Sequence, residues 1–111
     1  MKIISINTNG IRAAHRKGFF DWMQKQEADV VCIQETKAQT NQLVDEILSP
    51  NGYYAEFIDA KKKGYSGTAI YSKKKQKNLY QMFYKKNLNL AFLTLINGLY
   101  LKGNQQMQLK V

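Results

Sequence analysis

The sequence is poor in cysteine, proline and histidine, each of which occurs once in 111 residues. A single cysteine, Cys32, excludes an internal disulfide and is typical of a reducing compartment, so we expect a cytoplasmic protein. No apolar run reaches the roughly 18 residues that a membrane span needs, and the first residues lack the order of a signal peptide. The sequence therefore predicts no membrane partner, and it gives no sign of an obligate protein partner.

Acidic residues are missing from the second half of the chain. All eight Asp and Glu lie between Asp21 and Asp59, so residues 1–59 carry a net charge of −2, from six basic and eight acidic residues. Residues 60–111 carry eleven Lys and a net charge of +11, which gives the whole chain its +9. Such a charge favours a polyanionic partner such as a nucleic acid. A solvated or disordered tail is the alternative interpretation of the same composition.

The first 75 residues show alternating strand and helix patterns. β-branched residues predict a strand that ends near Asn7, and residues 8–18 look like a loop. An apolar run over 28–35 predicts a strand buried on both faces, in which Cys32 is a small hydrophobe rather than a nucleophile. Helices are expected over 19–28 and 40–49. The first would place Phe19, Trp22, Met23 and Gln26 on one face, and the second Leu43, Val44, Ile47 and Leu48.

Two further strands, over 52–60 and 67–73, are expected to form a hairpin around a loop at 61–66. The order of strand, helix, strand, helix and hairpin is typical of an α/β fold in which helices cover a sheet.

Two predicted strands end in a side chain that can bind a metal ion. Asn7 ends the first strand, and Glu35 follows the second. Sites in layered α/β folds gather beyond strand ends, and amide and carboxylate oxygens are ligands suited to Mg²⁺. A turn-forming Asn and a solvated Glu would give the same pattern, so the spacing alone leaves both interpretations open.

Basic residues flank this candidate metal site on two loops. Arg12, Arg16 and Lys17 follow the first strand, and three lysines with Tyr65 lie in the hairpin loop. Two basic loops around a metal could straddle a phosphate backbone. Ordinary surface lysines and arginines are the alternative.

Three phrases of the sequence, "ISINTNGIRAA", "DVVCIQETK" and "KKGYSGTAIYSK", occur in this order over about residues 1–75. Together they resemble the exodeoxyribonuclease III family of DNA-repair enzymes. This family of AP endonucleases belongs to the endonuclease/exonuclease/phosphatase superfamily. The resemblance implies an α/β fold, the N-terminal half of a four-layer α/β sandwich in which two sheets are flanked by helices.

The resemblance also implies site residues. Asn7 and Glu35 match the positions that organise the reacting phosphate and hold Mg²⁺, for which Mn²⁺ could substitute. Arg12, Arg16 and Lys17, with Gly64 and Tyr65 of the "GYSG" loop, match segments that lie along the DNA. The implied reaction is hydrolysis of a phosphodiester at an abasic site, with 3′→5′ exonuclease activity. The implied partner is double-stranded DNA with abasic sites or 3′ ends.

The chain also departs from the family. An Asp-x-Asn motif, a catalytic Tyr and a late Ser-Asp-His motif are absent, the single histidine is His15, and no Asp or Glu follows Asp59. Whether the chain is itself an enzyme therefore stays open, since a group that activates water contributes about 10² to 10⁴ in rate. A non-catalytic nucleic-acid-binding fragment and a non-functional gene product are the alternatives.

Residues 76–111 do not continue the resemblance. They are rich in Leu, Asn, Gln and Lys, a vocabulary typical of an AT-rich coding sequence read out of frame. We therefore expect two segments: residues 1–75 as the N-terminal part of the nuclease domain, and residues 76–111 as a tail produced by a frameshift near codons 73–77. A genuine C-terminal segment is the alternative, in which "LNLAFLTLINGLYL" pairs as a hairpin around its "NG".

Overall fold

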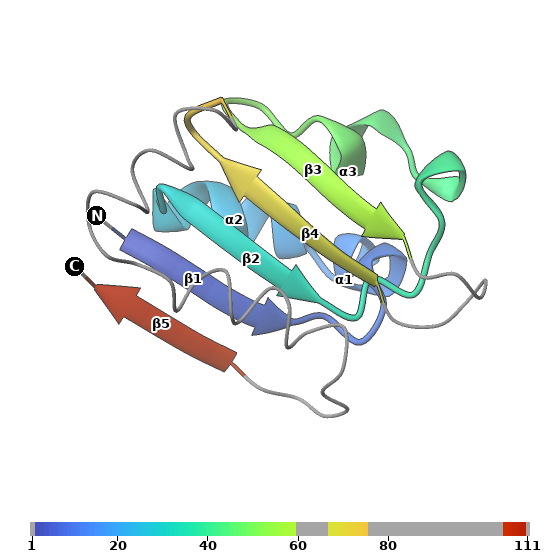
Figure 1. Ribbon diagram of the computed structural model, residues 1–111, viewed down its shortest axis with the longest axis horizontal. Coiled ribbons are helices and arrows are strands. Elements are labelled where there is room, and N and C mark those ends of the chain that lie inside the picture. Colours follow the sequence, from blue (N-terminus) through green and yellow to red (C-terminus); the bar gives the residue numbers. More distant parts are fainter. Residues whose placement is uncertain (1, 60–66, 76–105, 111) are drawn as a thin grey trace.

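A computed structural model describes residues 2–59, 67–75 and 106–110, and its centre is one five-stranded sheet (Figure 1). Across the sheet the strand order is β3-β4-β2-β1-β5. The strands are β1 (Lys2–Asn7), β2 (Val30–Gln34), β3 (Tyr54–Asp59), β4 (Gly67–Ser72) and β5 (Gln106–Lys110). β1 and β2 are parallel, whereas the other three pairs are antiparallel. The predicted hairpin of the third and fourth strands is confirmed.

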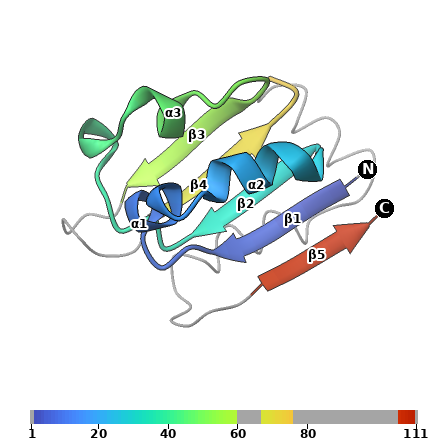
Figure 2. The same ribbon diagram turned by 180° about the vertical axis from the view of Figure 1, so that it is seen from behind.

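The described helices all lie on one face of the sheet, in front of it in Figure 2. They are α1 (Ile11–Arg16), α2 (Phe19–Gln26) and α3 (Asp45–Leu48), with a 3₁₀ turn, η1, over Thr40–Gln42. α1 and α2 form the crossover between the parallel strands β1 and β2, as a parallel connection requires. Among the described residues, no helix is both long enough and apolar enough to cross a membrane.

The hydrophobic core lies between this helical layer and the sheet. Phe20 and Met23 of α2 and Ile47 of α3 pack there against side chains of the central strands. The ring of Tyr71, from β4, makes edge contacts with Phe20 and Phe57 at 5.6 and 5.9 Å between centroids. All five residues of β2 are buried, which confirms the strand predicted to be buried on both faces. Its Cys32 is fully buried, and burial raises the pKa of this thiol to about 12.

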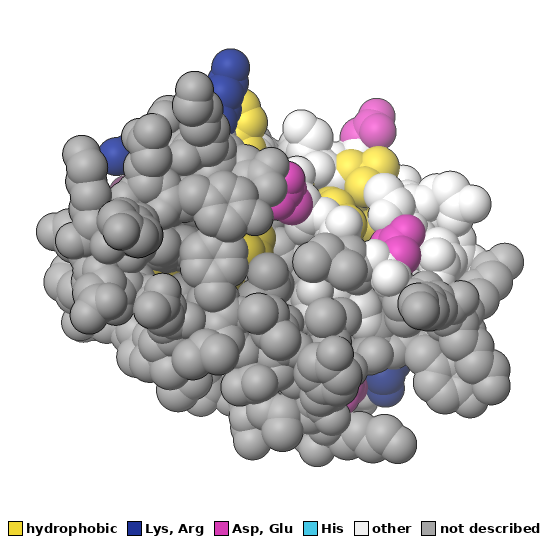
Figure 3. Space-filling model, viewed as in Figure 1, with side chains coloured by type: hydrophobic (Ala, Val, Ile, Leu, Met, Phe, Trp, Pro, Cys, Tyr) yellow, Lys and Arg dark blue, Asp and Glu magenta, His cyan; other side chains and the backbone are white. Residues whose placement is uncertain are grey.

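The opposite face of the sheet is more polar. Strand alternation places Ser5, Cys32, Gln34, Thr68 and Ser72 on it, and all five are buried. No described helix lies on this face, which is the side seen in Figures 1 and 3. In Figure 3 the described Lys and Arg side chains are scattered singly over this side and do not form one patch.

The predicted loop over 8–18 is wrong in part, because residues 11–16 form α1. The helix is too short to be stable alone, so tertiary contacts must hold it. Ile11 is completely buried, and its backbone N–H donates to the Thr36 carbonyl at 2.9 Å. The loop was predicted from Gly10 and Gly18, and this prediction did not take the burial of Ile11 into account.

The single helix predicted over 40–49 is also wrong, since Leu43 and Val44 are extended between η1 and α3. The Asp59 carboxylate holds Thr40 by its backbone N–H at 2.9 Å and its hydroxyl at 2.7 Å. These hydrogen bonds join η1 to β3. Because the chain is extended between η1 and α3, Leu43 and Ile47 both reach the core, whereas Val44 is 52% exposed.

The helix predicted over 19–28 is confirmed, but its predicted face is not. Phe20 and Met23 are the buried pair, Phe19 is half-buried and Trp22 is 41% exposed. β5 was not predicted: the sequence alone gave no reason to pair residues 106–110 with β1. The hairpin considered within residues 88–101 lies outside the described residues.

Candidate functional site at the ends of β1 and β2

The predicted site residues Asn7 and Glu35 lie at the same end of the sheet. Asn7 pairs with Gln34 at the end of the parallel strands, and Glu35 comes next. Backbone bonds continue the pairing beyond the strands: Thr8 N–H donates to the Gln34 carbonyl at 3.0 Å, and Gly10 N–H to the Glu35 carbonyl at 2.8 Å. Two loops that each carry one candidate ligand are therefore joined through their main chains.

The Asn7 side chain is oriented by its own loop. It is 9% exposed, and its Oδ1 accepts a hydrogen bond from the Asn9 backbone N–H at 2.9 Å. Asn9 makes this contact in the left-handed region, with φ of 47°, which Asn tolerates better than most residues. Gly10 follows with φ of 112°, a value that favours glycine.

Glu35 also has a left-handed backbone, with φ of 53°, and is 8% exposed. The Lys37 Nζ lies 3.7 Å from its Oε2 and also donates a hydrogen bond to Asn9 Oδ1. Lys37 has φ of 51°, so three left-handed residues other than glycine meet here. Such backbone strain costs about 1–3 kcal/mol per residue and clusters at functional sites.

A row of polar side chains crosses three strands beside these loops. Strand register places Asn7 next to Gln34 and Gln34 next to Thr68. Gln34 Nε2 donates to Ser5 Oγ at 2.9 Å, which satisfies part of the row. The Thr68 hydroxyl is fully buried and has no hydrogen-bond partner among residues 2–59, 67–75 and 106–110. Buried polar groups are normally paired, so this hydroxyl is an exception within the row.

The donor chemistry fits a hard divalent cation with few protein ligands. Within the described part of the chain, no three His, Cys, Asp or Glu side chains converge on one point. The candidate donors are therefore one carboxylate, Glu35, and the amide oxygen of Asn7. Mg²⁺ is commonly bound by one or two carboxylates while waters and substrate phosphates complete its shell. This donor set fits Mg²⁺ in that mode better than Zn²⁺, whose sites have three or four protein ligands drawn mainly from Cys and His.

The predicted DNA-side residues of the first loop lie on and just after α1. Arg12, Arg16 and Lys17 are all exposed, and Arg12 and Arg16 share a helix face at a spacing of four. Arg12, Arg16 and His15 line one side of a groove of about 470 Å³, and its other side includes Asp45 and Glu46. The groove is thus mixed in charge.

His15 contacts the acidic side of the groove and not the strand ends. Its Nε2 lies 2.9 Å from Glu46 Oε2, which joins α1 to α3.

Gly64 and Tyr65 lie outside the described residues. The residues that flank their segment, Asp59 and Gly67, pair with each other. The Gly67 carbonyl accepts a hydrogen bond from Thr36 N–H at 3.1 Å, so β4 begins beside Glu35. Of the eleven lysines in residues 60–111, seven also lie outside the described ranges.

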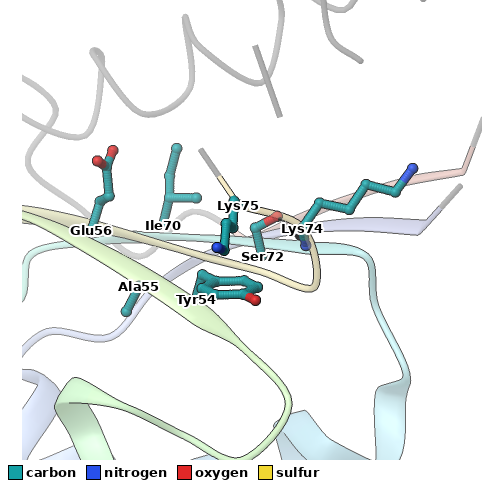
Figure 4. Close-up of a pocket in the computed structure, with 7 residues that line it drawn as sticks. All are labelled: Tyr54, Ala55, Glu56, Ile70, Ser72, Lys74 and Lys75. Atoms are coloured by element: carbon teal, nitrogen blue, oxygen red, sulfur yellow. Dashed lines mark hydrogen bonds between the residues drawn. The ribbon is translucent and has the colours of Figure 1, made fainter. Parts of the chain in front are cut away.

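A second pocket, of about 210 Å³, lies at the other end of the strands (Figure 4). Tyr54 and Lys75 help to line it, with the Lys75 Nζ 6.0 Å from the Tyr54 ring centroid. Register places Tyr54 beside Ser72 and Ser72 beside Val30, four residues along β2 from Gln34. This pocket is therefore separate from Asn7 and Glu35.

Asn9 and Lys37 were missed as site residues by the sequence interpretation. Both stand inside the phrases that carried the resemblance, "INTNG" and "QETK". Their positions in the sequence could have indicated them, because each lies two residues after a candidate ligand. Their contact with each other joins residues 28 positions apart and required the structure.

Comparison with known proteins gives consistent matches. The family described as "Endonuclease/Exonuclease/phosphatase family" matches residues 4–101. An exodeoxyribonuclease of Bacillus subtilis is 50% identical over 74 residues, which are 66% of this chain and 28% of that protein. A DNA-(apurinic or apyrimidinic site) endonuclease of Dictyostelium discoideum is 41% identical over 75 residues, 68% of this chain and 20% of that protein.

The solved structures agree with the sequence matches. An AP endonuclease from Archaeoglobus fulgidus superposes with a TM-score of 0.58 at 29% identity, covering 68% of this chain and 28% of that one. The chain thus spans less than a third of the length of each of these three relatives. Its α/β fold matches part of an AP endonuclease, and the family match extends past residue 75.

Proposed function

Because the chain belongs to the endonuclease/exonuclease/phosphatase family, we propose that residues 1–75 are the N-terminal part of a DNA-repair nuclease of exodeoxyribonuclease III type. In this proposal the described sheet is one half of a four-layer α/β sandwich. The one-sided helical layer supports it, because the helices would form an outer layer. The face with Ser5 and Gln34 would then point toward a second sheet.

The proposed metal site is formed by Asn7 and Glu35, with Mg²⁺ as the ion and Mn²⁺ as a substitute. The main-chain bonds between their loops carry this proposal, since they fix both donors at one sheet end. When bound, the ion would stabilise the negative charge that develops on a phosphodiester during hydrolysis. Asn9 would orient the Asn7 amide, and Glu35 would supply the anionic donor.

The proposed partner is double-stranded DNA that contains an abasic site or a 3′ end. Arg12, Arg16 and Lys17 would contact backbone phosphates, because they are exposed on and just after α1, the helix that follows the Asn7 loop. Gly64 and Tyr65 stay proposed contacts on the strength of the resemblance alone. Phosphate contacts of this kind give affinity that falls with salt.

Hydrolysis by this chain is proposed to be slow. Its one histidine pairs with Glu46, away from the strand ends, and its sequence offers no carboxylate after Asp59 to activate water. Losing a general base lowers a rate by about 10² to 10⁴. Metal and DNA binding depend on other residues and should persist.

The test combines binding and cleavage of a labelled duplex with one abasic-site analogue. Wild type should bind the duplex and cleave it weakly with Mg²⁺, and Glu35→Gln should abolish the metal-dependent cleavage. Arg12→Gln and Arg16→Gln, each as a single variant, should weaken binding. Lys25→Gln removes one exposed positive charge on α2 and is the matched control. Equal cleavage by wild type and Glu35→Gln would reject the proposed site.

A non-catalytic nucleic-acid-binding function is the second candidate, and the charge of +11 on residues 60–111 favours it. Binding would then be insensitive to the abasic site and to Glu35, with a steep loss of affinity as salt rises. The same duplex without the abasic analogue separates the two functions, because only the nuclease site distinguishes the two duplexes.

A further inference from the structure

Lys37 joins the two loops of the proposed metal site through its side chain. Its Nζ lies 3.7 Å from Glu35 Oε2 and donates to Asn9 Oδ1. The Glu35 side chain is 11% exposed, whereas that of Lys37 is 42% exposed. A carboxylate this far removed from water requires an opposite charge or hydrogen bonds.

We propose that Lys37 is a stand-in cation, which balances the Glu35 carboxylate in the metal-free protein and competes with a divalent ion for it. This inference rests on the proposed function, which places the ion at Glu35. Lys37 is thereby a positioning residue that sets how strongly the free protein holds metal. No role for Lys37 follows from the fold alone.

The different anchoring of the two residues supports competition. The Glu35 main chain is held by its carbonyl, which accepts bonds from Gly10 N–H and from the Thr8 hydroxyl at 3.1 Å. The Lys37 ammonium sits on a flexible four-carbon stem and is partly in solvent, so it can withdraw. An arriving divalent ion would therefore displace the ammonium and leave the carboxylate in place.

The expected size of the effect follows from the Coulomb attraction between Lys37 and Glu35. A divalent ion that displaces the ammonium must overcome this attraction, which salt at physiological strength weakens only in part. Removing the ammonium should therefore tighten divalent-ion binding by about fivefold. The hydrogen bond from Lys37 to Asn9 has the opposite effect, since losing it frees the loop, but it is made on an exposed side and is worth less.

The experiment measures Mn²⁺ binding to the full 111-residue chain without DNA, by electron paramagnetic resonance of the free ion. Lys37→Gln should bind Mn²⁺ about fivefold more tightly than wild type. Lys37→Arg should match wild type because it keeps the charge. Lys25→Gln should also match wild type, although it lowers the net charge equally. In a Glu35→Gln background, Lys37→Gln should give no gain.

Equal or weaker Mn²⁺ binding by Lys37→Gln would overturn the proposal. If instead Glu35→Gln binds Mn²⁺ like wild type, the proposed function fails at its metal site, so the two failures are distinguishable. A second measurement avoids dependence on a variant that does not fold. The NMR signal of the Lys37 ammonium in wild type should shift with added Mg²⁺, and an unchanged signal would contradict displacement.

Discussion

Replacing Tyr71 by Phe tests how the helical layer is fixed to the sheet. The Tyr71 hydroxyl donates to the Ile47 carbonyl at 2.6 Å, and Tyr71 is completely buried. Ile47 lies in the last turn of α3, where carbonyls have no partner within the helix. The substitution keeps the ring and its contacts with Phe20 and Phe57 but leaves this carbonyl unpaired.

A buried acceptor that loses its partner costs about 1–3 kcal/mol. That is a large share of the roughly 5–15 kcal/mol expected for the free energy of unfolding of a domain. In a small domain it corresponds to a fall in Tm of at least about 4 °C. Urea unfolding followed by far-UV circular dichroism measures the free energy, with an unchanged slope as the condition for comparison.

Tyr54→Phe is the matched control, since Tyr54 is 50% exposed on β3. It should change the free energy of unfolding by less than about 0.5 kcal/mol, as surface substitutions usually do. If Tyr71→Phe is as stable as wild type, the hydroxyl does not link β4 to α3 and the reasoning is refuted.

Three further predictions concern Cys32, Gly10 and the coding sequence. Burial raises the pKa of the Cys32 thiol from 9.0 to about 12. As the pH rises, the Cys32 thiol therefore ionises in the unfolded chain before it ionises in the folded one. Between pH 9 and 12 the free energy of unfolding should fall by up to about 4 kcal/mol more in wild type than in Cys32→Ala. An equal pH dependence of the two proteins would contradict this expectation. Gly10→Ala should cost about 1–2 kcal/mol in the same urea assay, because φ of 112° strains any residue with a Cβ, and no loss would show that the loop adjusts freely. Nucleotides beyond codon 75 should encode Asp-x-Asn and Ser-Asp-His motifs in another frame, and their absence from all frames would make residues 76–111 a genuine segment.

Strong local patterns predicted most of the sheet. The continuous apolar run of β2 predicted strand type and burial, because periodicity reports directly on which faces meet the core. β4 was predicted as a strand, although not its burial along its whole length. The sequence did not predict α1, because the helix is stabilised by one buried residue, Ile11, and by a backbone hydrogen bond to Thr36. The sequence did not predict β5 either, because the pairing of residues 2–6 with residues 106–110 depends on tertiary contacts that local sequence patterns do not indicate.

The sequence predicted the two candidate donors, Asn7 and Glu35, but not the residues that contact them. Asn7 and Glu35 follow from side-chain chemistry at strand ends, and their parallel pairing explains why the two loops meet. The contact between Lys37 and Asn9 depends on left-handed backbone at both residues. Sequence patterns do not specify such conformations for residues other than glycine, so this contact required coordinates.

The location of the metal ion tests the central claim most directly. Small amounts of Mn²⁺ added to the ¹⁵N-labelled chain broaden the NMR signals of amides near the bound ion. The account predicts that amides of residues 8–10 and 35–37 and of Gly67 broaden first, because these lie around Asn7 and Glu35. Broadening centred instead on the acidic pair Asp45 and Glu46 of the α1–α3 groove, or no selective broadening, would contradict a nuclease metal site at the ends of β1 and β2.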